Sequence, residues 1–159
     1  MQTVHSLKRL LQAAYDHELD PDEALAHIAN DLVLPVESCA CLDISRKSRC
    51  GIPEVVLAEG KHPSHLRSII ESYVTSMGRC IISRLDPALA MTFIEWARTE
   101  DISAYWSDEG RVLVLAKGTH VEKTGGLIGI ITAGTSDIRV AEEARIIAEE
   151  MGCDVKTAY

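Results

Sequence analysis

A glycine-bounded apolar run near the end of the chain constrains the fold most strongly. Residues 125–131 read Gly-Gly-Leu-Ile-Gly-Ile-Ile, and a small polar loop and a helix-patterned segment from Asp137 to Met151 follow. An apolar run without polar alternation predicts a strand that is buried on both faces. A strand, a polar loop and a helix in this order predict the start of a parallel α/β sheet, in which such loops hold anionic ligands. The chain ends at Tyr159, one predicted strand later.

The spacing of apolar residues in the last predicted helix indicates which face is buried. A single stripe at helical spacing predicts the buried side, and the charged residues are expected to lie outside it. The stripe consists of Val140, Ala144, Ile147 and Met151, and the charged residues outside it are Glu142, Glu143, Arg145, Glu149 and Glu150.

Composition excludes several classes of function. The 159 residues carry a formal net charge of −8 and have a pI of about 5.2, which argues against general attraction to nucleic acid or to an anionic membrane. No apolar stretch approaches the roughly 20 residues that a membrane helix needs, and the first residues lack the pattern of a signal peptide. The five cysteines are odd in number and scattered, so free thiols in a reducing compartment are expected. The sequence therefore predicts a cytoplasmic protein.

Local patterns predict an α/β chain. Residues 1–35 are expected to form a helical hairpin, whose second helix starts after Asp20 as a cap. Residues 38–98 alternate strand and helix patterns, and two short strands follow at 102–106 and 111–116.

The predicted organisation has three parts. An N-terminal helical and mixed α/β region covers residues 1–118, and a linker rich in glycine and threonine covers 119–126. Residues 127–159 then form the opening βαβ unit of a doubly wound parallel sheet of the PurE or flavodoxin type, which is expected to be incomplete.

The loop Ala133-Gly134-Thr135-Ser136-Asp137 is the first candidate site. Backbone N–H groups at a helix start have no helical partner, and together with the hydroxyls of Thr135 and Ser136 they can hold phosphate or carboxylate oxygens. A carboxylate beside such an anion, as Asp137 would be, tends to have a raised pKa and suits proton exchange. The alternative is that Ser136 or Thr135 only caps the helix, while Asp137 complements its dipole.

A basic segment is the second candidate site. Residues 43–84 contain seven Lys or Arg and four acids, a local excess of three positive charges. Arg46 and Arg49 are three residues apart ahead of a Gly and Pro turn, a spacing that suits a bidentate contact with an anion. Lys61 follows after Glu59-Gly60. A solvated loop is the alternative, because most surface charges have no ligand.

These two motifs, in this order, closely resemble the pyridinium-3,5-biscarboxylic acid mononucleotide synthase family. That family comprises the LarB-like carboxylases and hydrolases of nickel-pincer cofactor biosynthesis, which are related to the PurE family of aminoimidazole ribonucleotide carboxylases. The resemblance spans most of residues 38–159. It is carried by Asp43, Arg46, Arg49, Gly51, Pro53-Glu54-Val55-Val56, Glu59-Gly60-Lys61, Ala133-Gly134-Thr135-Ser136-Asp137 and Val140-Ala141-Glu142-Glu143-Ala144.

The resemblance implies a reaction on nicotinic acid adenine dinucleotide. The pyridinium ring would be carboxylated with bicarbonate or CO2, and the phosphoanhydride would be cleaved to release AMP. Asp137 and Ser136 are the implied catalytic residues. Substrate binding is assigned to Gly134, Thr135, Ser136, Arg46, Arg49 and Lys61, and no bound cofactor or metal is expected.

The chain also departs from this family. The family's doubly wound domain continues beyond the second strand, and the cysteine thought to add to the pyridinium ring lies in that later part. Cys153 does not match it and is expected to be structural. We therefore expect the chain to be a poor catalyst alone, and to act as a homo-oligomer or with a second chain that supplies the missing half. Two alternatives stay open: an aminoimidazole ribonucleotide carboxylase, and a non-catalytic module that binds a nucleotide or assembles with a partner.

Overall fold

The computed structural model describes residues 2–24, 33–36, 40–43, 46, 52–118 and 120–159. It divides into two compact units, residues 1–45 and 46–159. None of the helices in the described part of the chain is both long and apolar enough to span a membrane.

The first unit contains a helix and a hairpin. Helix α1 (Gln2–Tyr15) is confirmed, and strands β1 (Val33–Val36) and β2 (Ala40–Asp43) pair antiparallel. The predicted cap Asp20 is also confirmed, because its Oδ1 accepts a hydrogen bond from the Asp22 N–H at 2.8 Å. Residues 21–24 are helical, and the rest of that predicted helix lies outside the described residues. Strand β1 was not predicted.

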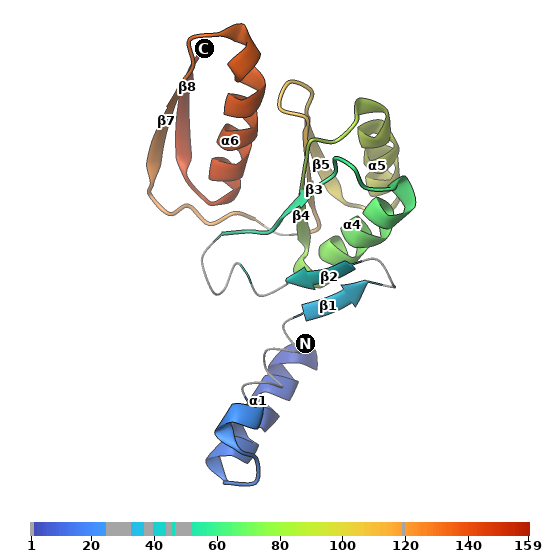
Figure 1. Ribbon diagram of the computed structural model, residues 1–159, viewed down its shortest axis with the longest axis vertical. Helices are drawn as coiled ribbons and strands as arrows, with labels where there is room; N and C mark the ends of the chain where they lie inside the picture. The colour runs from blue at the N-terminus through green and yellow to red at the C-terminus, as the bar shows by residue number, and fades with distance from the viewer. Residues whose placement is uncertain (1, 25–32, 37–39, 44–45, 47–51, 119) are drawn as a thin grey trace. The chain divides into compact units, whose positions relative to one another are not determined.

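The second unit is built around a four-stranded mixed sheet with the order β3-β4-β6-β5. Strands β3 and β4 are parallel, and β6 is antiparallel to both of its neighbours. Figure 1 shows α4 and α5 on one side of this sheet. The elements are β3 (Val55–Leu57), α4 (Pro63–Met77), β4 (Arg79–Ser83), α5 (Pro87–Thr99), β5 (Ser103–Ser107) and β6 (Val112–Ala116).

Prolines and caps set the bounds of α4 and α5. Pro63 and Pro87 occupy the first turns of the two helices, where a missing N–H costs nothing. The Asp86 side chain accepts hydrogen bonds from the Ala88 and Leu89 N–H groups at 2.9 and 3.3 Å. Gly78 ends α4 with φ of 69°, a conformation that glycine adopts without strain. These two helices alternate with β3 and β4 along the chain, which confirms the predicted alternation of strand and helix in this region.

The two faces of the four-stranded sheet bury different residues. Cys80, Ile82, Leu113 and Leu115 alternate with the residues of the other face and are buried. On that other face, Ile81 and Val114 form a cluster with Val112 and with Ile146, which comes from the last helix. The core of this unit therefore extends on both sides of the sheet.

The end of the chain forms the predicted βαβ unit. Strand β7 (Leu127–Ile131) pairs parallel with β8 (Asp154–Ala158), and helix α6 (Ile138–Glu150) connects them. The α/β fold class and the opening βαβ unit are thus confirmed. Residues 120–126, within the predicted linker, contain no helix or strand.

The predicted burial of β7 is wrong. Leu127 is 66% exposed and Ile131 is 83% exposed, although an apolar run of this kind predicts a strand covered on both faces. The strand has one neighbour in its sheet, β8. Within the described residues, nothing covers the face that carries these two side chains.

The predicted faces of α6 are also wrong. Val140, in the predicted buried stripe, is 66% exposed, whereas the side chains of Glu142 and Arg145 are only 13% and 18% exposed. The helix turns its charged side toward the four-stranded sheet, where these residues find partners. Periodicity identified the helix, but tertiary partners decided which side of it is covered.

Candidate functional site

The loop between β7 and α6 lies at the carboxyl end of a parallel strand, where open α/β sheets bind their ligands. Residues Thr135–Asp137 form a single 3-10 turn that leads into α6, and the Asp137 N–H donates to the Gly134 carbonyl at 3.1 Å. The side chains of Thr135, Ser136 and Asp137 are exposed. The turn therefore presents two hydroxyls and a carboxylate to solvent at a helix N-terminus.

The capping alternative for this loop is observed in part, because Asp137 lies in the first turn, where its carboxylate complements the helix dipole. Among the described residues, no side-chain hydrogen bond caps α6 at Asp137 or the preceding turn at Gly134. The Ser136 hydroxyl instead donates to Oδ1 of Asp137 at 3.4 Å. The first amides of α6 are thus left without a side-chain partner, which is the arrangement that an anion can complete.

Thr132 adds a further polar group ahead of this turn. Its backbone N–H donates to the Ala158 carbonyl of β8 at 3.1 Å. Its hydroxyl oxygen is buried and finds no hydrogen-bond partner within the described part of the chain. Buried polar atoms are normally paired, and a hydroxyl can both donate and accept a hydrogen bond.

The basic segment is only partly described. Arg46 forms an ion pair with Glu54 at 3.3 Å, and their side chains are 46% and 31% exposed. Lys61 is exposed, and its backbone N–H closes a turn on Ala58. Arg49 lies outside the described residues. The role of Arg46 and Lys61 in substrate binding therefore stays a prediction.

A charged cluster on α6 was missed by the sequence analysis. The Arg145 guanidinium donates to Glu142 and Glu149 on its own helix and to the Tyr105 hydroxyl of β5, with all distances between 2.7 and 3.0 Å. The Tyr159 hydroxyl also donates to Glu142. The hydrogen bond from Arg145 lowers the pKa of Glu142 against the effect of burial. Helical spacing makes the Glu142–Arg145–Glu149 row visible in sequence, but Tyr105 and Tyr159 are distant in it.

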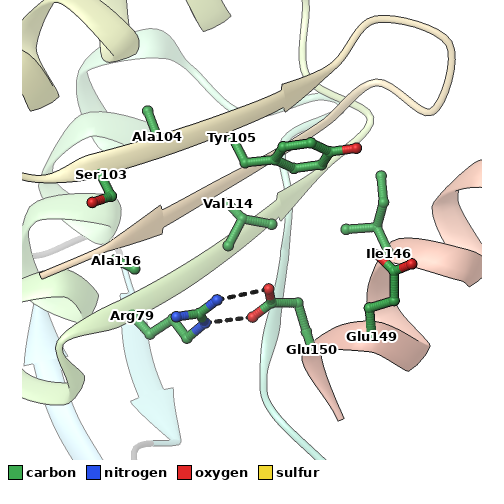
Figure 2. Close-up of a pocket in the computed structure, with 9 residues that line it drawn as sticks. All are labelled: Arg79, Ser103, Ala104, Tyr105, Val114, Ala116, Ile146, Glu149 and Glu150. Atoms are coloured by element: carbon green, nitrogen blue, oxygen red, sulfur yellow. Dashed lines mark hydrogen bonds and ion pairs between the residues drawn. The ribbon is translucent and has the colours of Figure 1, made fainter. Parts of the chain in front are cut away.

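A groove separates α6 from the sheet beside this cluster. Figure 2 shows its walls, with Ser103, Tyr105 and Val114 on the sheet and Ile146 and Glu149 on α6. Its volume is about 270 Å³. Arg79 and Glu150 lie across the groove from each other and form a two-point ion pair, one bond of which joins Nη2 to Oε1 at 2.8 Å. The hydrogen bond to Glu150 raises the pKa of Arg79.

The cysteines and histidines whose surroundings the structure describes include Cys80, Cys153, His62 and His65. Cys80 is buried, and desolvation raises the pKa of its thiol well above the ordinary value. Cys153 is half-buried, with its sulfur 3.9 Å from the Thr124 hydroxyl oxygen. The exposed rings of His62 and His65 lie 5.6 Å apart. No group of three or more metal-ligating side chains occurs within the described residues. Cys39 and Cys50 lie outside them.

Comparison of the sequence with known proteins places the chain in a family. Residues 35–117, just over half of the chain, match the sequence model of the LarB/PurE-like N-terminal domain. The chain belongs to the LarB/PurE-like family. The matched LarB/PurE-like domain spans the four-stranded sheet with α4 and α5 and includes the basic segment, whereas the loop before α6 lies beyond the match.

A full-length relative gives the extent of the similarity. The uncharacterized protein MJ0165 of Methanocaldococcus jannaschii is 31% identical over 157 residues, which are 97% of this chain and 60% of that protein. The chain thus spans about three fifths of the length of this relative.

Proposed function

We propose that this chain is a LarB-like carboxylase and hydrolase that acts on nicotinic acid adenine dinucleotide, carboxylating the pyridinium ring and releasing AMP for nickel-pincer cofactor biosynthesis. The observation that carries the proposal is the loop at the start of α6, because it combines uncapped amides with exposed Thr135, Ser136 and Asp137. Membership of the LarB/PurE-like family supports the reaction class.

Each loop residue has a role that its chemistry allows. Gly134 has no side chain, so the backbone can approach a phosphate closely. The amides before α6 and the hydroxyls of Thr135 and Ser136 would hold the nucleotide phosphate. Asp137, whose Oδ1 accepts a hydrogen bond from the Ser136 hydroxyl at 3.4 Å, would be the group that exchanges a proton with the substrate. Arg46, Arg49 and Lys61 are secondary binding residues in this proposal.

The exposed apolar residues of β7 support a partner. Strand β7 carries isoleucine and leucine on both faces, whereas β8 is mostly polar, with Asp154 and Lys156. Apolar residues on both faces are typical of an inner strand, and charged residues are typical of an edge strand. We therefore propose that a further polypeptide covers β7, either a second copy or a chain that completes the sheet. The site would then be complete only in the assembly.

A turnover assay tests both the proposed substrate and the need for a partner chain. The purified chain is incubated with nicotinic acid adenine dinucleotide and labelled bicarbonate, and AMP release and label incorporation are followed. Enzymes typically turn over about 1 to 1,000 times per second, and we expect the chain alone to fall at least about a hundredfold below that range. Full activity without a partner would contradict the proposed assembly, and the absence of both binding and turnover would contradict the proposed function.

A non-catalytic module is the second candidate, and the exposed β7 face favours it. Such a module would bind the nucleotide or a partner without chemistry. Native mass spectrometry with and without nicotinic acid adenine dinucleotide separates the two, because tight binding without turnover in any assembly supports the module. Turnover of aminoimidazole ribonucleotide in the same assay would instead support the purine carboxylase.

A further inference from the structure

The contact between α6 and the four-stranded sheet is held by charged side chains around a small apolar centre. Ile146 is the α6 residue in the buried cluster with Ile81, Val112 and Val114. Val140, on another side of the helix, is 66% exposed. Besides the apolar contact of Ile146, α6 meets the sheet through polar contacts, of which Figure 2 marks the ion pair between Arg79 and Glu150.

The first polar attachment joins Arg79 of β4 to Glu150 in the last turn of α6. The guanidinium donates through Nε and Nη2 to the two carboxylate oxygens of Glu150. The two side chains are 24% and 11% exposed. A two-point contact between planar groups restricts orientation as well as distance, and partial burial strengthens it.

The second attachment is Arg145, one and a half turns earlier on the helix. Its Nη2 donates to the Tyr105 hydroxyl of β5 at 3.0 Å and to Glu142 at 2.9 Å. Its Nη1 donates to Glu149 at 2.7 Å. The two acids hold the guanidinium in one orientation, so that it can reach the strand. At a rise of 1.5 Å per residue, Arg145 and Glu150 lie about 7.5 Å apart along α6.

We propose that Arg79 and Arg145 are positioning residues. They fix α6 at two points on the LarB/PurE-like domain, and so fix the Gly134–Asp137 loop at the start of the same helix. The effect of this positioning on nucleotide binding rests on the proposed function, in which the loop is the nucleotide site. The LarB/PurE-like domain would thus set the orientation of a loop that lies outside it.

Amide hydrogen exchange of the chain without ligand tests the attachment itself. In Arg79→Met and Arg145→Met, we expect exchange to rise at least about tenfold in α6 and in residues 132–138, while α4 and α5 keep their protection. Arg67→Met is the matched control, because it removes an arginine whose ion pair with Glu71 lies within α4, where the two side chains are 46% and 42% exposed. Tyr105→Phe removes one hydroxyl from a 49% exposed side chain and serves if an arginine variant fails to fold.

Rescue separates positioning from general loss of stability. The exchanged pair Arg79→Glu with Glu150→Arg is expected to restore the protection of the loop. Arg145→Lys is expected to restore little, since an ammonium group cannot reach Tyr105, Glu142 and Glu149 in the same planar geometry. Unchanged exchange in residues 132–138, or an equal rise in α4 and α5, would overturn the inference.

Nucleotide binding supplies the functional readout. If the wild-type chain binds nicotinic acid adenine dinucleotide, its affinity is expected to fall about tenfold or more in Arg79→Met and Arg145→Met and to stay unchanged in Arg67→Met. If amide exchange in α6 rises in these variants while their affinity for the nucleotide stays unchanged, the positioning role is overturned. If the wild-type chain binds no nucleotide, the proposed function fails, and the exchange measurement alone decides whether the two arginines hold the loop.

Discussion

Replacing Gly152 with alanine is expected to destabilise the protein by about 2–5 kcal/mol. Gly152 has φ of 86°, and a Cβ at this position would lie 2.2 Å from the Glu122 carbonyl oxygen. A backbone atom cannot rotate away as a side chain can, so the segment before β7 must move. That movement would break the hydrogen bond from the Thr124 N–H to the Gly152 carbonyl at 3.0 Å. Urea denaturation measures the loss of unfolding free energy. The loss is taken from the shift of the denaturation midpoint, provided that the dependence of the free energy on urea concentration is the same in both proteins.

Gly60→Ala separates backbone strain from steric overlap. Gly60 has φ of 77°, but a Cβ there meets no atom within 4 Å. Gly60→Ala is expected to lower the free energy of unfolding by about 1 kcal/mol, which is the cost of a left-handed conformation alone. Equal losses for the two variants would show that the segment around Glu122 does not pack on the turn between α6 and β8.

Replacing Ser136 with aspartate is expected to weaken nucleotide binding at least about a hundredfold, because a second carboxylate beside Asp137 repels an anionic ligand. The same change places a negative charge at the N-terminus of α6, which the helix dipole favours. Stability should therefore stay level or rise slightly while affinity falls. Calorimetric titration with nicotinic acid adenine dinucleotide and a melting curve measure the two effects separately.

Ser76→Asp is the matched control for charge. Ser76 is exposed near the end of α4, so this variant adds the same negative charge at the opposite kind of helix end. It is expected to leave affinity unchanged and to lower stability by about 0.5 kcal/mol. A comparable loss of affinity in both variants would indicate a general charge effect and would contradict a binding site at Ser136.

Elements with strong local signals were predictable from the sequence. Pro63 and Pro87 mark the starts of α4 and α5, and Gly78 ends α4, because each residue acts through its own backbone geometry. The alternation of these signals with short β-prone runs also predicted the strands of the four-stranded sheet. Such features depend on a few neighbouring residues, so they can be predicted without knowledge of the tertiary fold.

Burial could not be predicted at the same level, because it depends on what packs against an element. Strand β7 has the sequence of an inner strand, yet Ile131 is 83% exposed since the described chain supplies no neighbour for that face. Strand β1 includes Pro35, a residue that disfavours strands and weakened the signal there. In α6, Glu142 and Arg145 are covered because Tyr105 of β5 and Tyr159, the residue after β8, reach them.

The candidate site was predicted in part. The position of the Ser136–Asp137 turn between a strand and a helix follows from local pattern, and the structure places it there. The contribution of Arg79 and Tyr105 to holding that helix was not visible, because each contacts α6 across 40 or more residues of sequence. The helical row of Glu142, Arg145 and Glu149 was the available signal, and it was read as a solvated face.

The most direct test of a nucleotide site at the start of α6 is an NMR titration of the isotopically labelled chain with nicotinic acid adenine dinucleotide. We expect the amide signals of Thr135, Ser136 and Asp137 to shift most and to saturate with a single affinity, while those of α4 and α5 stay in place. Saturable shifts that leave these three amides unmoved, or no shift at millimolar ligand, would contradict the account.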